Sequence, residues 1–107
     1  MNLTEKTCKA CSGETPRLSD EEIGSLHGEV RDWQIMEGHH LWRAFTFADF
    51  LTALEFVNKV AVVAEQEGHH PDIVLKWGAV DVTIYTHKVD GLTEADFILA
   101  AKIDQMT

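Results

Sequence analysis

Basic residues are scarce in this sequence. Nine lysines and arginines face eighteen aspartates and glutamates, which gives a formal net charge of -9 at pH 7. A protein that follows the phosphates of a nucleic acid needs a basic patch, and so does one that attaches electrostatically to anionic lipid. We therefore expect neither nucleic acid nor a membrane surface among the partners of this chain.

Long apolar runs are also lacking. No stretch approaches the roughly 20 residues that a membrane-spanning helix requires, although apolar residues make up 45% of the chain. Residues 1–17 are polar, and they lack the apolar segment of a secretory signal. This pattern predicts a cytoplasmic protein with a polar N-terminal tail over residues 1–17.

Cysteine is nearly absent: only Cys8 and Cys11 occur, as a C-x-x-C pair. A thioredoxin-like motif would follow a strand of a βαβ unit, and no such strand precedes the pair. A zinc site would need two further ligands, which a second copy of the chain could supply. We interpret the pair as two reduced thiols on the tail rather than as a metal site.

The remaining length, residues 18–107, is enough for one domain with one modest core. Apolar periodicity and turn residues predict alternating elements. Helices are expected over residues 19–30, 50–68 and from 93 onward, and strands over residues 33–36, 41–47, 73–77 and 80–86. This order, α-β-β-α-β-β-α, predicts an α+β fold in which a four-stranded antiparallel sheet carries three helices on one face.

Several residues mark where these elements begin, end and face the core. Capping boxes at Ser19 and at Thr93 with Asp96 predict two helix starts, and Gly68 followed by Pro71 predicts the end of the long helix. Its buried stripe is expected at helical spacing, at Phe50, Leu54, Val57, Ala61 and Ala64. In the last strand, the inward-facing residues should be Val80, Val82, Ile84 and Thr86.

A dense set of polar residues follows the long helix: Glu65, His69, His70, Trp77, His87 and Asp96. Imidazole can give or take a proton near neutral pH, so three histidines at element ends suit a reaction that moves two protons. Glu65 lies one helical turn before His69 and could orient its ring. Each residue also has an ordinary structural interpretation: a helix cap for Asp96, a core position for Trp77, and a solvated charge for Glu65.

Two further histidines, His39 and His40, fall in an expected hairpin turn. We interpret them as surface residues. A metal site that combines them with His69, His70 and His87 is conceivable, because imidazole is a common ligand. The sequence, however, lacks the close local pair that catalytic zinc sites usually show.

The spacing of this polar set resembles the signature of the pterin-4a-carbinolamine dehydratase family. Glu65-x-x-x-His69-His70-Pro71 is followed by five residues to Trp77, nine to His87 and eight to Asp96. The resemblance runs from about Leu18 to the C-terminus, and Arg43-Ala44-Phe45-Thr46-Phe47 and Gly91-Leu92-Thr93 also match. The chain departs from the family at Gly68, where an acidic residue often precedes the first histidine.

The resemblance implies an enzyme, a 4a-hydroxytetrahydrobiopterin dehydratase of the hydro-lyase class. It would convert a 4a-hydroxytetrahydropterin to quinonoid dihydropterin by histidine acid/base catalysis, in tetrahydrobiopterin recycling after aromatic amino acid hydroxylation. A homodimer or homotetramer without any cofactor is implied. The residues carried over are His69, His70 and His87 as catalytic, Glu65 and Asp96 as supporting, and Trp77 and Thr86 with the three histidines as substrate-binding.

Within this scheme, we expect His70 or His87 to be the acid and His69, backed by Glu65, to be the base. A second hypothesis is a non-catalytic oligomeric partner that regulates another protein, since members of the family double as a dimerisation cofactor of a homeodomain transcription factor. The retained set of three histidines favours the enzyme.

Overall fold

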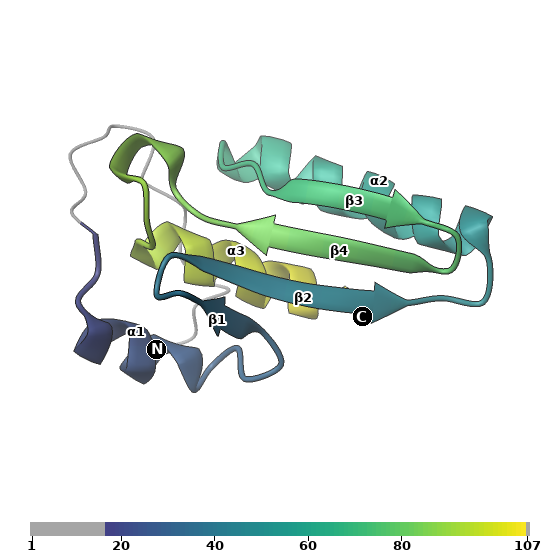
Figure 1. Ribbon diagram of the computed structural model, residues 1–107. Helices are drawn as coiled ribbons and strands as arrows, with labels where there is room; N and C mark the ends of the chain where they lie inside the picture. The colour runs from purple at the N-terminus through teal and green to yellow at the C-terminus, as the bar shows by residue number, and fades with distance from the viewer. Residues whose placement is uncertain (1–16, 107) are drawn as a thin grey trace.

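A computed structural model describes residues 17–106; the predicted tail, except Arg17, lies outside these residues. The described elements follow the order α1 (Asp20–His27), β1 (Gln34–Met36), β2 (His40–Thr46), α2 (Phe50–Glu67), β3 (Asp72–Lys76), β4 (Ala79–Ile84), a single 3₁₀ turn η3 (His87–Val89) and α3 (Glu94–Asp104). The strands form an antiparallel sheet in the order β1-β2-β4-β3 (Figure 1). The predicted α+β fold and element order are confirmed.

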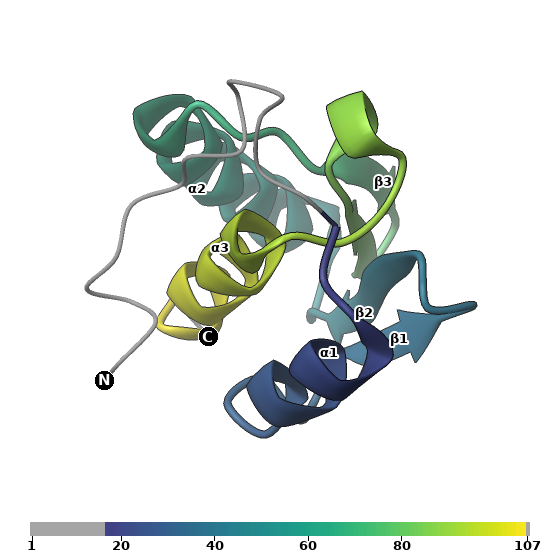
Figure 2. The ribbon, with the colours of Figure 1, turned by 90° about the vertical axis from the view of Figure 1, so that its left-hand side faces the viewer.

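The sheet and the helices form two layers. Seen along the sheet, α1, α2 and α3 all lie on one side of the strands, as Figure 2 shows. Strand β4 lies between β2 and β3, and its alternate residues Val80, Val82 and Ile84 are buried as predicted. Side chains on adjacent positions of a strand point to opposite faces, so the polar residues of β4 lie on the face without helices.

Helix α2 buries a different stripe from the one predicted. The buried residues are Ala53, Phe56, Val60 and Ala64, so only Ala64 belongs to both sets. Phe50, expected in the core, is 44% exposed, and Ala61 is exposed as well. Apolar residues occupy both stripes of α2, so their spacing alone could not decide which stripe faces the sheet.

The ends of the helices follow the sequence signals. Ser19 and Glu22 form the predicted capping box of α1, and Asp49 caps α2 by accepting from the Thr52 N–H. Gly68 ends α2 in the left-handed conformation, at φ 64°, which glycine adopts without steric cost. The chain therefore turns sharply immediately before His69 and His70.

Helix α3 is buried on nearly all sides, from Ala95 to Ala101 and at Ile103. At its C-terminal end, Asp104 accepts hydrogen bonds from the Trp33 indole (2.8 Å) and the Arg43 guanidinium (2.6 Å). Burial raises the pKa of the Asp104 carboxyl, and these two partners oppose that rise. None of the helices in the described part of the chain is long and apolar enough to cross a membrane.

Candidate active site

Four segments that are distant in the sequence meet at one end of the sheet. The turn after α2 brings His69 and His70, the end of β4 brings Thr86, η3 brings His87, and the first turn of α3 brings Asp96. A pocket of about 370 Å³ opens here, lined by residues 68–72 and 86–88. The three histidines singled out in the sequence therefore surround one cavity.

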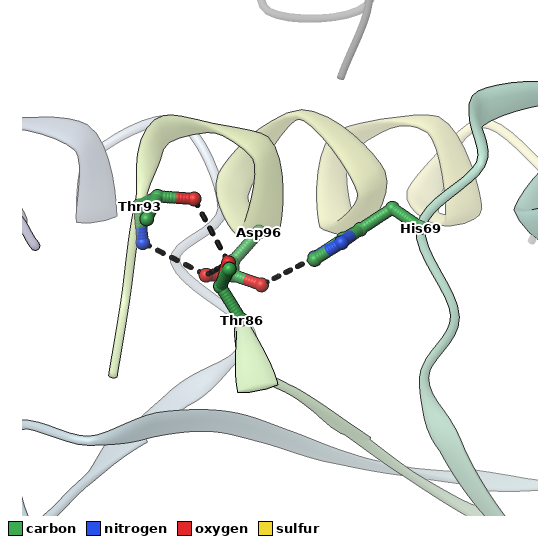
Figure 3. Close-up of polar contacts among 4 residues, drawn as sticks. All are labelled: His69, Thr86, Thr93 and Asp96. Carbon is green, nitrogen blue, oxygen red and sulfur yellow. Dashed lines mark hydrogen bonds and ion pairs between the residues drawn. The ribbon is translucent and has the colours of Figure 1, made fainter. Parts of the chain in front are cut away.

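His69 is the buried member of this group, with 7% of its surface exposed. Its Nε2 lies 2.5 Å from Oδ1 of Asp96, a side chain with no exposed surface (Figure 3). An ionised carboxylate only accepts hydrogen bonds, so this contact assigns a proton to Nε2. Nδ1 is then the ring nitrogen left to interact with another group.

The other oxygen of Asp96 is held as firmly. Its Oδ2 accepts from the Thr86 hydroxyl at 2.9 Å and from the Thr93 N–H at 2.8 Å (Figure 3). The hydroxyls of Thr86 and Thr93 lie 2.9 Å apart, and because the Thr86 hydrogen points to Asp96, the Thr93 hydroxyl must be the donor between them. Asp96 thus combines its predicted capping role with a second role, which is to anchor His69.

The expected pairing of Glu65 with His69 is wrong. Glu65 Oε2 instead lies 2.6 Å from Nε2 of His70, and both side chains are largely exposed. The reason lies in the backbone. The chain leaves α2 at Gly68, which is in the left-handed conformation, so His69 no longer follows Glu65 at helical spacing. His69 turns inward to Asp96, and His70 folds back over the last turn of α2.

His87 borders the same pocket but is held differently. Its imidazole is exposed and stacks on Tyr85, with ring centroids 4.2 Å apart and planes 20° from parallel. Within residues 17–106, no hydrogen bond to this imidazole is observed. The pocket therefore presents three imidazoles in three settings: buried and anchored, exposed and paired with a carboxylate, and exposed and stacked.

Trp77 is not brought to this pocket. It lies in the turn between β3 and β4, at the end of the sheet away from the α2–β3 connection (Figure 1). Its side chain is 73% exposed, so the alternative core interpretation is wrong. Of the residues predicted to bind substrate, His69, His70, Thr86 and His87 line the pocket within one chain.

His39 and His40 are not the free surface residues that the sequence suggested. Both are half-buried, and the His39 ring lies 4.7 Å from that of Tyr85. Leu41 pairs with Ile84, so the residues just before Leu41 come beside Tyr85. This neighbourhood depends on the pairing of β2 with β4, which a turn signal cannot reveal.

No group of three or more histidine, cysteine, aspartate or glutamate side chains in the described residues is arranged to hold a metal ion. The conceivable metal site of five histidines is therefore not formed there, since its members are divided between the pocket and the Tyr85 neighbourhood. Cys8 and Cys11 lie outside the described residues.

Comparison with known proteins gives a consistent result. The family model described as pterin 4 alpha carbinolamine dehydratase matches residues 16–106. A protein of Rubrobacter xylanophilus, provisionally named a pterin-4-alpha-carbinolamine dehydratase, is 47% identical over 104 residues, which are 97% of each chain. A Rickettsia bellii protein with the same name is 51% identical over 104 residues, covering 96% of this chain and 92% of its own.

Two solved structures are similar. One, described as a transcriptional coactivator/pterin dehydratase from Brucella melitensis, has a TM-score of 0.78 and 35% identity, with 84% of this chain and 97% of that chain covered. The other is described as a pterin dehydratase-like RuBisCO assembly factor of the alpha-carboxysome. At 24% identity and a TM-score of 0.57, over 69% and 84% of the two chains, it supports the fold alone.

Proposed function

The chain belongs to the pterin 4 alpha carbinolamine dehydratase family, and we propose that it converts a 4a-hydroxytetrahydropterin to a quinonoid dihydropterin by histidine acid/base catalysis. The observation that carries this proposal is the convergence of His69, His70 and His87 on one pocket. The proposed setting is cytoplasmic tetrahydrobiopterin recycling after aromatic amino acid hydroxylation.

The reaction needs two proton transfers and no change in oxidation state. An acid protonates the 4a-hydroxyl, the C4a–O bond breaks and water leaves. A base takes the proton from N5, and the nitrogen electron pair forms the C4a=N5 double bond. Imidazole groups supply both transfers near neutral pH, so the scheme requires no metal and no organic cofactor.

The three settings suggest a division of roles. His70 is assigned as the base, because the Glu65 carboxylate faces the positive charge that its ring acquires with a proton. His87, which has no carboxylate partner of its own in the described structure, is assigned as the acid. His69, fixed by Asp96, orients the pterin through its free nitrogen. This replaces the expectation that His69, backed by Glu65, is the base.

Binding of an unreactive pterin separates this function from the alternative of a non-catalytic regulatory partner. We expect 7,8-dihydrobiopterin, which lacks the 4a-hydroxyl, to shift the imidazole NMR signals of His69, His70 and His87. The signals of His27, whose ring is bonded to the Trp33 carbonyl, should stay unchanged. A folded protein in which millimolar ligand shifts none of the three would contradict the proposal.

An oligomer is also proposed, and α2 supplies the reason. Leu51 is 69% and Val62 57% exposed, on the side of α2 opposite its buried stripe. Their separation of eleven residues is close to three helical turns of about 3.6 residues, so they lie on one face. Burying each such side chain against another copy would contribute roughly 1.5–3 kcal/mol.

Light scattering tests this assembly directly. The wild-type protein should have a mass that is a multiple of the 12.0 kDa chain, a dimer or a tetramer. The double variant Leu51→Glu/Val62→Glu should fall to a smaller species, while Lys59→Glu, also on α2, should not. A wild-type mass of one chain would overturn the oligomer.

A further inference from the structure

We propose that Tyr85 is a positioning residue that holds the His87 imidazole at the pocket for the proposed dehydration. The inference rests on the proposed function for its role in catalysis. Its structural basis is a chain of contacts among His39, Tyr85, His87 and Asp90, of which His87 lines the pocket and the other three do not.

The need for such a device follows from how the three histidines are held. His69 is fixed by Asp96 and His70 is bonded to Glu65. The exposed imidazole of His87 makes no hydrogen bond in the described structure, and its stacking on Tyr85 is the contact that restricts its rotation. A proton donor must lie within hydrogen-bond reach of the group it protonates, so this stacking sets how often the ring is in place.

On its other side, Tyr85 contacts His39, which in turn contacts Asp90. The His39 ring lies on Tyr85, with centroids 4.7 Å apart and planes 44° from parallel, and its Nε2 lies 2.8 Å from Oδ1 of Asp90. The N–H of Asp90 in turn donates to the carbonyl of His87 at 3.2 Å. The contacts thus form a closed circuit, which runs from the His87 side chain through Tyr85, His39 and Asp90 back to the backbone of His87.

Backbone hydrogen bonds and the conformation of Asp90 hold these four residues in place. Thr86, between Tyr85 and His87, donates its N–H to the Gly91 carbonyl at 2.9 Å and its hydroxyl to Asp96. Asp90 has φ 51°, in the left-handed region, and its carboxyl pKa is lowered chiefly by the hydrogen bond with His39. The same segment therefore fixes the anchor of His69 on one side and the support of His87 on the other.

Two substitutions distinguish the contribution of the Tyr85 aromatic ring from that of its hydroxyl. Tyr85→Phe keeps the aromatic face and should preserve kcat, whereas Tyr85→Thr removes it and should lower kcat about tenfold with little change in KM. That loss is smaller than the roughly 10²–10⁴-fold contribution of a positioned acid, because the imidazole remains but is misplaced. Thr83→Ala, two residues earlier on β4 and away from His87, is the matched control.

A second readout does not depend on activity. Stacking on an aromatic ring shifts the His87 ring protons upfield in the NMR spectrum, so the shift should persist in Tyr85→Phe and be lost in Tyr85→Thr. Asp90→Gly, which suits the left-handed backbone, should reduce it partly. Absence of the upfield shift in wild type, or full kcat in Tyr85→Thr after the shift is lost, would overturn the inference.

The two proposals fail in different ways. A wild-type protein that has no dehydratase activity overturns the proposed function and with it the catalytic role of Tyr85. The upfield shift and its loss in Tyr85→Thr would still establish that Tyr85 holds the His87 ring.

Discussion

Replacing His70 by alanine is expected to lower kcat/KM for the dehydration roughly 10²–10⁴-fold, the usual contribution of a positioned general base. His70 is largely exposed and its partner Glu65 more so, so the free energy of unfolding should change by no more than about 0.5 kcal/mol. The loss should therefore appear in catalysis alone. Steady-state kinetics and urea unfolding of the same variant measure the two effects.

Three comparisons show whether this loss reflects proton transfer. Glu65→Gln should reduce kcat/KM less than His70→Ala does, because the imidazole remains. Added imidazole should restore part of the rate of His70→Ala by taking the vacated place. His27→Ala deletes a histidine away from the pocket and should keep wild-type kinetics. Wild-type activity in His70→Ala would remove His70 from the mechanism.

Replacing Asp96 by alanine is expected to lower the free energy of unfolding by roughly 3–5 kcal/mol, as when one partner of a buried charged pair is removed. Three donors would lose their acceptor: the His69 ring, the Thr86 hydroxyl and the Thr93 N–H. The total free energy of unfolding of a native protein is only about 5–15 kcal/mol, so this loss is a large share of it.

Urea unfolding followed by circular dichroism measures this change. Glu21→Ala removes an exposed carboxylate from the first turn of α1 and should stay within about 0.5 kcal/mol of wild type. Asp96→Asn keeps one acceptor oxygen and should lie between the two. A loss below about 1 kcal/mol in Asp96→Ala would mean that Asp96 acts only as a helix cap, which typically contributes that much.

What the sequence predicted well is local. The alternation of β4 needs only neighbouring residues, as do the capping signals at Ser19 and Thr93. Gly68 followed by Pro71 placed the end of α2 correctly because both residues restrict the backbone themselves. Along with the signature spacing, these signals led to the element order and to the histidines that line the pocket.

What the sequence did not predict depends on contacts between elements. Helix α2 has apolar residues on two stripes, and only the sheet decides which stripe is buried. The partner of His69 is Asp96, 27 positions away, rather than the nearby Glu65, because the turn at Gly68 redirects the ring. The contact of His39 with Tyr85 requires β2 to pair with β4, and no local sequence signal in either strand predicts that pairing.

The most direct test of the account is the dehydration of a 4a-hydroxytetrahydropterin by the wild-type protein, followed by absorbance against buffer alone at neutral pH. Wild-type protein treated with a chelator should accelerate the reaction saturably, and this acceleration should collapse in His70→Ala and in His87→Ala. Folded wild-type protein that leaves the buffer rate unchanged would contradict the proposed activity and favour a non-catalytic binding role.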